Sequence, residues 1–429
     1  MRNISALAAL LAAAACLPGF AQTPTRLTLA DAQKIAIQNE PRLASAALVA
    51  RAAGQVVNEA RSAYLPSVYG NITGVGADEG TAVAAGALTT SSLSSRVAFG
   101  VTVSQLVSDF GRTGNLTGSA KLRAQAQNQN IVTTRAQILL DVQQAYYSAL
   151  GAQSVAKVAQ AALDDRRLVL RQITALAASS LKSTLDVRFA EVAVSEAELA
   201  LYQAQNDASS AQARLSAALG YGQTMSFDLV EESMPAPLEP DVDPFVAEAL
   251  HDRPDLAALD LARNAQHRFA DAEKDLRYPT LSALATVGEV PTHDAGYRGD
   301  HYGAAGMNLN IPVFNGGLFS ARRAEADLRA EAADKDFQEL TLQISRDVRV
   351  AWLNANTAFR RLDVAARLVA EANEALRLAQ ARYDIGLGSI VELTQAQYTQ
   401  TSAQIASANA TYEYLSRRSA LNYATGALR

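Results

Sequence analysis

Apolar residues recur at alternating spacings of four and three positions over a long stretch near the C-terminus. The stretch consists of Ile344, Val348, Ala351, Ala355, Ala358, Leu362, Ala365, Val369, Ala372, Leu376, Ala379 and Tyr383. A heptad seam of this kind is typical of a coiled coil. It predicts a helix over residues 317–385, whose length at 1.5 Å per residue is roughly 100 Å. Because such a helix cannot fold back within a compact domain, it needs partner helices from the other half of the chain or from other subunits.

The same seam is present 206 positions earlier, from Ile138 to Ala177, and Arg166 interrupts its apolar character. Shorter matches hold the same offset, since residues 107–111 match 313–317 and residues 122–124 match 328–330. Further upstream, residues 40–43 match 253–256 at an offset of 213. The two halves are therefore predicted to be structural duplicates. The first repeat covers 22–220, a connector rich in Pro, Asp and Glu covers 221–243, and the second repeat covers 244–429.

Each repeat is predicted to begin with one helix, over residues 29–63 and 244–277, followed by a proline and two extended runs. The clearest extended runs alternate apolar residues with small or polar ones. The alternating apolar residues are Val97, Phe99, Val101 and Val103 in the first repeat, and Met307, Leu309 and Ile311 in the second. A period of two predicts strands with one apolar and one polar face. Residues 77–95 and 288–301, rich in Gly, Ala, Ser and Thr, are predicted to be solvent-facing loops.

A repeated turn follows each long helix. Residues 386–393 interrupt the helical pattern and restart it, and residues 180–187 are their counterpart. Ser389 and Ser183 are good N-cap residues, and each is followed three positions later by an acid, Glu392 or Asp186. This spacing predicts a capping box at both restarts. Each repeat should therefore end in a helical hairpin that carries a carboxylate in its returning first turn.

Composition narrows the class of protein. The chain has 429 residues, 49% of them hydrophobic and 19% charged, with a net charge of −5. This balance argues against a nucleic-acid binder with a basic face. One Cys and four His exclude a disulfide framework and a Cys/His zinc cluster. No apolar run of 18 residues follows the N-terminal segment, which excludes a helical membrane protein but leaves a membrane β-barrel possible.

The first 21 residues have the order of a secretory signal peptide, with Arg2, an apolar run and a small-residue exit. We predict cleavage after Ala21. An N-terminal anchor helix is the alternative for this segment, and lipidation of Cys16 is an alternative form of processing. No Ser/His/Asp set, nucleophile elbow or phosphate-binding glycine motif is present, so neither enzymatic activity nor a metal or other cofactor is predicted.

The chain resembles the TolC-like outer-membrane efflux family over its whole mature length. The resemblance is carried by residues 27–32, the Leu65–Pro66 step, residues 312–317 and the turn at 386–397. It implies a mainly α fold with a small β part. Duplicated long helical hairpins would form a trimeric α-barrel, and four strands per chain would complete a 12-stranded transmembrane β-barrel. It further implies a homotrimer in the cell outer membrane, with a large periplasmic part, a periplasmic adaptor and an inner-membrane transporter as partners.

The resemblance also implies sites. The periplasmic aperture would be lined by residues near the second turn, with Asp186 across from them; the set is Tyr383, Leu387, Gly388, Glu392, Gln395 and Asp186. Family members often carry a basic residue in place of Gly388 and an acid in place of Gln395. The strand residues Val97, Phe99, Val101, Val103, Met307, Leu309 and Ile311 would face outer-membrane lipid, and Ser104, Asn308 and Asn310 would face the lumen.

The function expected from these features is the exit duct of a tripartite efflux or type I secretion system. The alternative is a periplasmic coiled-coil adaptor or tether without a conducting pore. A metal-exporting specialisation is a subordinate alternative, which the few His, Cys and Met residues do not support. The exported substrate is left open by the sequence.

Overall fold

The computed structural model describes residues 25–76, 82–85, 88–92, 95–293 and 299–428. The predicted signal peptide, its cleavage site and Cys16 lie outside these residues. The helices are α2 (Leu29–Asn39), α3 (Pro41–Ser62), α4 (Arg112–Ala178), α5 (Thr184–Ala218), α6 (Asp243–Asp252), α7 (Pro254–Lys274), the 3₁₀ helix η2 (Asp275–Arg277), α8 (Leu318–Asp384) and α9 (Ile390–Ala424). The strands are β1 (Thr25–Leu27), β2 (Ser67–Val75), β3 (Ala82–Ala85), β4 (Leu88–Ser92), β5 (Arg96–Ser108), β6 (Phe227–Leu229), β7 (Thr280–His293) and β8 (His301–Asn310). The order of two helices, strands, a 67-residue helix and a 35-residue helix occurs twice.

The first helix of each repeat is broken, which corrects the expectation of single helices over 29–63 and 244–277. The break lies at Glu40 and at Arg253, where ψ is 116° and 121°. Each of these residues precedes a proline, Pro41 or Pro254, and a proline disfavours the helical conformation of the residue before it. In each case the proline then begins a new helix, because its missing N–H is not needed in the first turn.

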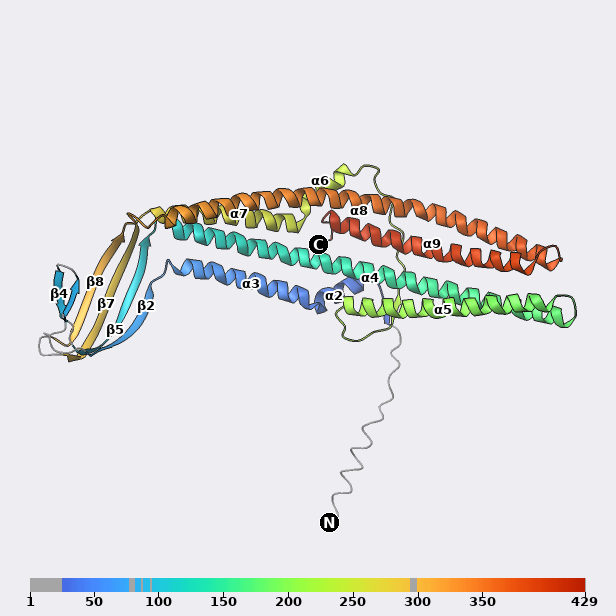
Figure 1. Cartoon of the computed structure of the whole chain (residues 1–429), viewed down its shortest axis with the longest axis horizontal. Coiled ribbons are helices and arrows are strands. Elements are labelled where there is room, and N and C mark those ends of the chain that lie inside the picture. The colour runs from blue at the N-terminus through green and yellow to red at the C-terminus, as the bar shows by residue number, and fades with distance from the viewer. Residues whose placement is uncertain (1–24, 77–81, 86–87, 93–94, 294–298, 429) are drawn as a thin grey trace, which may run out of the picture. The chain divides into compact units, whose positions relative to one another are not determined.

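The chain divides into two compact units. Unit 1 comprises the described residues within 25–41, 135–244 and 348–428, and unit 2 comprises those within 42–134 and 245–347. Unit 1 contains α2, α5, α9 and the tip-side parts of α4 and α8 (Figure 1). Its parallel β1–β6 pair is fastened to α4 by Tyr146, whose hydroxyl donates to the carbonyls of Leu27 and Val230 at 2.9 and 2.7 Å. The connector is therefore packed against the helices rather than free.

The heptad seams are buried as predicted. Every position of the second seam, from Ile344 to Tyr383, is buried or half-buried, and so is every position of the first. The first seam includes Arg166, which is 9% exposed. Among the helices that the structure describes, none is both long enough and apolar enough to cross a membrane.

The sheet of unit 2 is antiparallel and has the strand order β2-β5-β7-β8. Strands β2 and β8 lie at its edges, and within the described residues each pairs on one side only. Two predicted loops are partly strands, since β3 and β4 pair antiparallel within the first of them and β7 continues to His293 in the second. Ile311, predicted to belong to an alternating strand, lies just beyond the end of β8.

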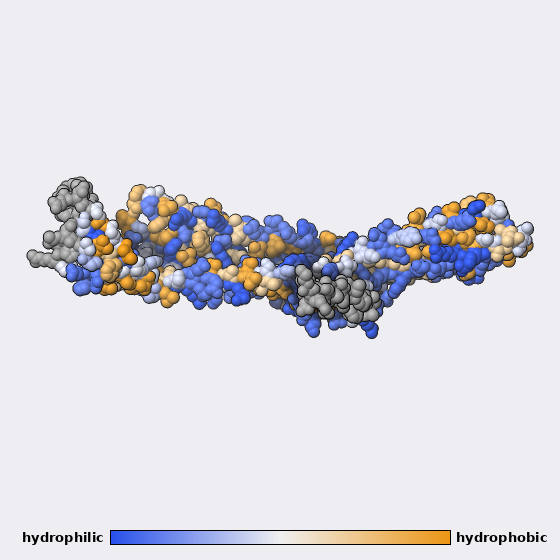
Figure 2. All heavy atoms as spheres, turned by 90° about the horizontal axis from the view of Figure 1, so that it is seen from below, coloured by the Kyte–Doolittle hydropathy of each residue, from blue (hydrophilic) through white to orange (hydrophobic). Residues whose placement is uncertain are grey.

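The strand register sorts side chains onto two faces, because directly paired residues share a face. Val101 pairs with Val287, and Met307 and Leu309 pair with Ala283 and Leu281. Val103, Phe99 and Val97 follow the same alternation on β5, apart from a register shift between Val97 and Phe99. Figure 2 shows hydrophobic residues gathered over the strand region.

The opposite face of the sheet is polar and carries an aromatic clamp. Ser104, Asn308 and Asn310 lie on this face, together with Thr102 and Thr286, whose hydroxyls are 3.3 Å apart.

Tyr302 reaches from β8 across two glycines. A Cβ added at Gly288 would lie 2.5 Å from the Tyr302 ring, and one added at Gly100 would collide with its hydroxyl. The ring thus covers Gly288 of β7 and Gly100 of β5, which holds three strands in register.

Candidate functional site: the tips of the two helical hairpins

The candidate site lies at the ends of two hairpins, α4–α5 and α8–α9, in unit 1 (Figure 1). Both turns have the same geometry. Ser180 and Gly386 adopt left-handed conformations with φ of 57° and 76°. The amides of Leu181 and Leu387 each donate to the carbonyl five residues earlier, at 2.9 and 2.8 Å. These bonds are those of a Schellman motif, which ends a helix and reverses the chain.

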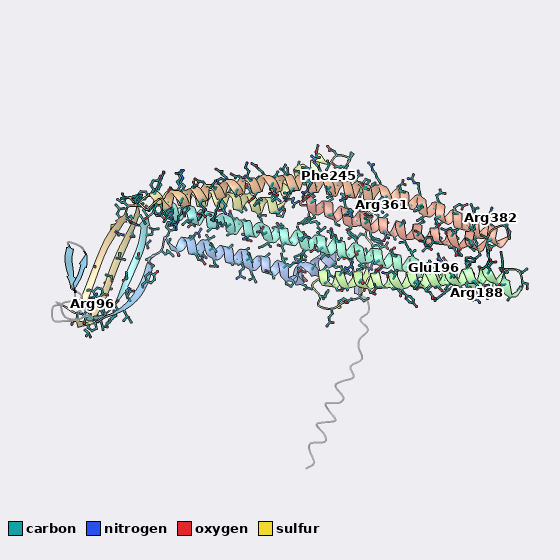
Figure 3. The ribbon with its side chains drawn as sticks, viewed as in Figure 1. Arg96, Arg188, Glu196, Phe245, Arg361 and Arg382 are labelled. Atoms are coloured by element: carbon teal, nitrogen blue, oxygen red, sulfur yellow. The ribbon has the colours of Figure 1, made fainter. Side chains whose placement is uncertain are left out.

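The returning helices are capped differently. Ser183 and Asp186 form the predicted capping box at the start of α5. At the start of α9 the Ser389 hydroxyl accepts from the amide of Glu392 at 3.1 Å, as predicted. The Glu392 carboxylate, however, lies 3.2 Å from Nε of Arg382 (labelled in Figure 3). The second capping box is therefore only half formed within the described residues, because the acid is turned toward the last turn of α8.

Tyr383 lies inside the protomer. Its side chain is 3% exposed and packs with Ile173, Ala190, Ile390 and Leu393, so that all four helices meet around it. Burial raises the pKa of Tyr383 to about 12, and the nearby carboxylate of Asp186 acts in the same direction. The fold thus brings together Tyr383 and Asp186, two of the predicted site residues, from different hairpins.

A lysine that sequence reasoning missed joins the two tips. Lys182 donates from Nζ to the carbonyl of Tyr383 at 2.8 Å, and its ammonium lies 3.7 Å from the centre of the Tyr383 ring. Lys182 is the counterpart of Gly388 at the offset of 206. The basic side chain expected at Gly388 is therefore carried by the other hairpin. The offset of 206, which aligns Lys182 with Gly388, is the one feature of the sequence that points to Lys182 as a site residue.

Gly388 fits a tightly packed turn. A Cβ at this position would lie 3.1 Å from the amide nitrogen of Tyr383 and 3.2 Å from Cβ of Arg382. The remaining predicted site residues, Leu387, Glu392 and Gln395, are exposed, and Leu387 is 69% exposed. In the described part of the chain, no group of three or more His, Cys, Asp or Glu side chains is arranged to hold a metal ion.

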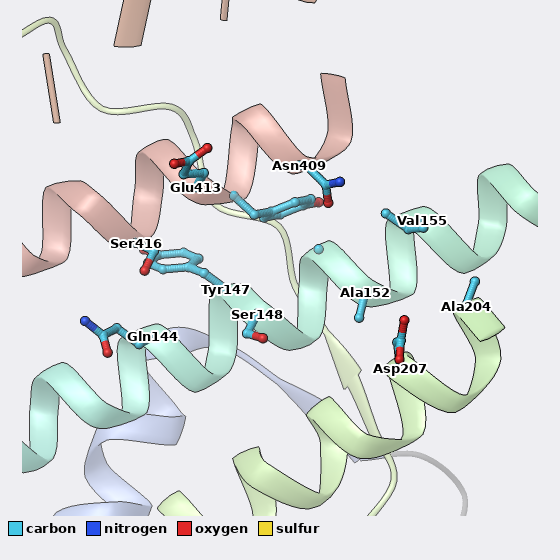
Figure 4. A pocket seen from close by; sticks show the side chains of 12 residues that line it. Gln144, Tyr147, Ser148, Ala152, Val155, Ala204, Asp207, Asn409, Glu413 and Ser416 are labelled. Atoms are coloured by element: carbon cyan, nitrogen blue, oxygen red, sulfur yellow. The ribbon is translucent and has the colours of Figure 1, made fainter. Parts of the chain in front are cut away.

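A second polar region lies in unit 1, in a cavity of about 410 Å³ between α4, α5 and α9 (Figure 4). Two tyrosines line it and reach the connector. The Tyr147 hydroxyl donates to Glu232 at 2.9 Å, and the Tyr412 hydroxyl donates to Glu231 at 3.3 Å. Burial raises the pKa of Tyr147 above its ordinary value. Both hydroxyls therefore remain protonated donors at neutral pH and hold the connector in place.

Duplicated helical hairpins that continue into amphipathic strands are typical of the class of bacterial outer-membrane efflux channels. The sequence profile described as "Outer membrane efflux protein" matches residues 33–221 and 245–427. The chain belongs to this family, as the motif resemblance implied, and its place is the outer membrane.

Individual relatives agree with this assignment. The chain is 24% identical to "Outer membrane protein TolC" of Salmonella enteritidis over 430 residues, which cover 96% of this chain and 84% of the relative. It is 25% identical over 423 residues to "Outer membrane efflux protein BepC" of Brucella suis biovar 1, covering 97% and 90% of the two chains. Its fold matches the solved structure of the transmembrane channel CusC with a TM-score of 0.80 at 16% identity, over 93% of this chain and 92% of that one.

Proposed function

We propose that three copies of this chain form the exit duct of an outer-membrane efflux or secretion system. Substrates would pass from the periplasm or from an inner-membrane transporter to the exterior. The sheet of unit 2 supports this proposal, because it has one apolar face and one polar face. Its two edge strands, β2 and β8, each pair with only one neighbour within the described residues. In lipid, unpaired backbone groups at an open edge are too costly to persist, so β2 of one copy would pair with β8 of the next.

Three copies are what the family resemblance implies, and the size of the lumen argues against two. Two copies would give eight strands, and the interior of an eight-stranded barrel is filled by side chains or holds one small ligand. Three copies of the four-stranded sheet give twelve strands and leave a wider lumen. The polar face with Thr102, Ser104 and Asn308 would line this lumen. The apolar face with Phe99, Val101 and Met307 would contact outer-membrane lipid.

The hairpin tips would form the periplasmic entrance. Leu387, Gly388, Glu392, Gln395 and Asp186 would surround it in three copies, while Tyr383, which is buried among the four helices, would pack behind them. The contact between Lys182 and Tyr383 would hold the two hairpins of each copy together in the closed arrangement. A periplasmic adaptor and an inner-membrane transporter would dock at this end. The role is transport rather than catalysis, in line with relatives whose names describe outer-membrane and efflux proteins.

Disulfide cross-linking between the two sheet edges tests the proposal. Cys16, in the predicted signal peptide, is the sole cysteine of the sequence, so the mature chain would be free of cysteine. Asn71→Cys on β2 would be combined in turn with Ala304→Cys, Gly306→Cys and Asn308→Cys on β8, three successive polar-face positions. We expect covalent trimers for one of these pairs after oxidation.

The control places the cysteine in a central strand. Asn71→Cys combined with Thr286→Cys, a polar-face position of β7, should give no cross-link between chains, because β7 pairs with neighbours on both sides. Absence of covalent trimers for all three edge pairs, or covalent dimers alone, would contradict the proposed closure. A tether without a pore would have no reason to join β2 to β8.

A further inference from the structure

A buried arginine occupies the heptad seam of α4. Arg166 is 9% exposed, and its counterpart in α8 at the offset of 206 is Ala372, which is 5% exposed. The second repeat therefore packs the same position with a methyl group. Burying a guanidinium costs free energy unless an anion and hydrogen bonds compensate it. The packing of the helices alone gives no reason for an arginine at this position.

The guanidinium of Arg166 has weak partners only. Nη1 donates to the carbonyl of Ala162, in its own helix, at 3.3 Å, and Nη1 and Nη2 lie 3.4 and 3.5 Å from the Thr401 hydroxyl. Among the described residues, no carboxylate lies within ion-pair distance of it. Burial lowers the pKa of Arg166, while the more distant charges of Glu196 and Asp165 act in the opposite direction. An arginine nevertheless keeps its charge, since the guanidinium stays protonated in proteins.

Arg166 lines a cavity of about 610 Å³ between α4, α5 and α9. Small side chains form much of the lining, including Ala159, Ala162, Ala197 and Ala204. Glu196, labelled in Figure 3, lines the cavity too and is exposed to solvent. The cavity therefore offers one buried positive charge beside an apolar wall, and one solvated negative charge at its edge. Its volume is in the range of small-molecule sites, about 300–1,000 Å³.

We propose that this cavity binds an amphipathic monocarboxylate, whose carboxylate pairs with Arg166 and whose hydrocarbon part lies against the alanine wall. A carboxylate matches the planar donors of a guanidinium and can bind it with two parallel hydrogen bonds. A single negative charge is favoured over a double one, because Glu196 repels a second charge. All the lining residues come from one chain, so one copy supplies the whole binding surface.

Octanoate is a suitable probe, with octanol as its neutral analogue of the same length. Binding to the full mature protein in lipid nanodiscs would be measured by titration calorimetry against empty nanodiscs. We expect octanoate to bind and octanol to bind much more weakly. Arg166→Met should weaken octanoate binding roughly tenfold or more, because the charge-assisted pair is lost. Glu196→Gln should strengthen it, because the repelling charge at the edge of the cavity is removed.

The adjacent Arg167 provides the matched control. It is exposed and pairs with Glu198 at 2.6 Å, so Arg167→Met removes the same charge one residue away without reaching the cavity. A crystal soaked with 8-bromooctanoate should show bromine anomalous signal beside α4, α5 and α9. Equal affinity of wild type and Arg166→Met would overturn the proposal, as would weaker binding by Glu196→Gln. A structure of the assembly in which a carboxylate of a neighbouring chain forms an ion pair with Arg166 would also overturn it. If Arg166→Met does not fold, the sign of the Glu196→Gln effect decides.

Discussion

Replacing Lys182 by Met should loosen the contact between the two hairpins of one chain. Methionine keeps the length and apolar stem of the side chain but removes the ammonium. The change therefore deletes the hydrogen bond to the Tyr383 carbonyl and the contact with the Tyr383 ring, which are the two interactions of that ammonium described above. The buried cluster around Tyr383 keeps its apolar side chains, so the fold of the tip should survive.

The size of the effect follows from these two contacts. A hydrogen bond from a charged donor contributes about 1.5–3 kcal/mol, and an exposed cation–π contact contributes about 0.5–1 kcal/mol. Lys182 is half-buried, so solvent screens both interactions and lowers their sum. A net loss of about 1–2 kcal/mol corresponds to a shift of roughly 5- to 30-fold in the equilibrium between joined and separated tips.

Spin labels on the two hairpins measure this shift. Leu185→Cys and Val391→Cys are equivalent exposed positions on α5 and α9, and the predicted mature chain has no other cysteine. Pulsed electron–electron double resonance measures the distance between the two labels of one chain. This distance should have a single short component in the wild-type background and a second, longer component when Lys182→Met is added. Arg188→Met is the control, because Arg188 pairs with Glu191 of its own helix at 2.8 Å. If Lys182→Met and Arg188→Met give the same distance distribution, the reasoning is refuted.

Three further predictions concern the strands, the entrance and the turn between α4 and α5. Cysteine at Asn308 should react with a water-soluble thiol reagent and cysteine at Phe99 should not; equal labelling would contradict the assigned faces. Glu392→Gln should weaken cation selectivity and block by divalent or trivalent cations in single-channel recordings, and unchanged recordings would leave Glu392 as a helix cap alone. Ser180→Gly should raise the thermal unfolding midpoint, because glycine adopts the φ of 57° without the cost of about 1–2 kcal/mol paid by other residues. A lower midpoint would show that the Ser180 side chain stabilises the turn.

The heptad seams could be predicted from the sequence because the same spacing recurs along each helix and in both repeats. The spacing of four and three predicted the buried seam from Ile344 to Tyr383, and the offset of 206 predicted its counterpart in α4. The spacing of Ser183 and Asp186 predicted their capping box. Each seam and the capping box involve residues within one helix or one turn, where the local geometry is fixed by the chain itself, and the offset of 206 carries the same local pattern into the other repeat.

Contacts between segments distant in sequence were not readable in this way. No pattern pairs Lys182 with the carbonyl of Tyr383, since the contact exists only after the two hairpins pack. Within one turn, too, the Glu392 carboxylate had two available partners, and the fold of the turn placed it beside Arg382 instead of its own helix end. The break at Glu40 was readable from Pro41, but the helical pattern on both sides obscured it.

Conductance in a planar lipid bilayer tests the central claim most directly. The full mature protein would be purified, its molecular mass measured in detergent, and the same sample added to one side of the bilayer. We expect a mass of three chains and stepwise single-channel currents, because three sheets of four strands would close around a lumen. A trimer that inserts without conducting would favour the structural tether. A monomer that neither inserts nor conducts would contradict the closure of the sheet between copies.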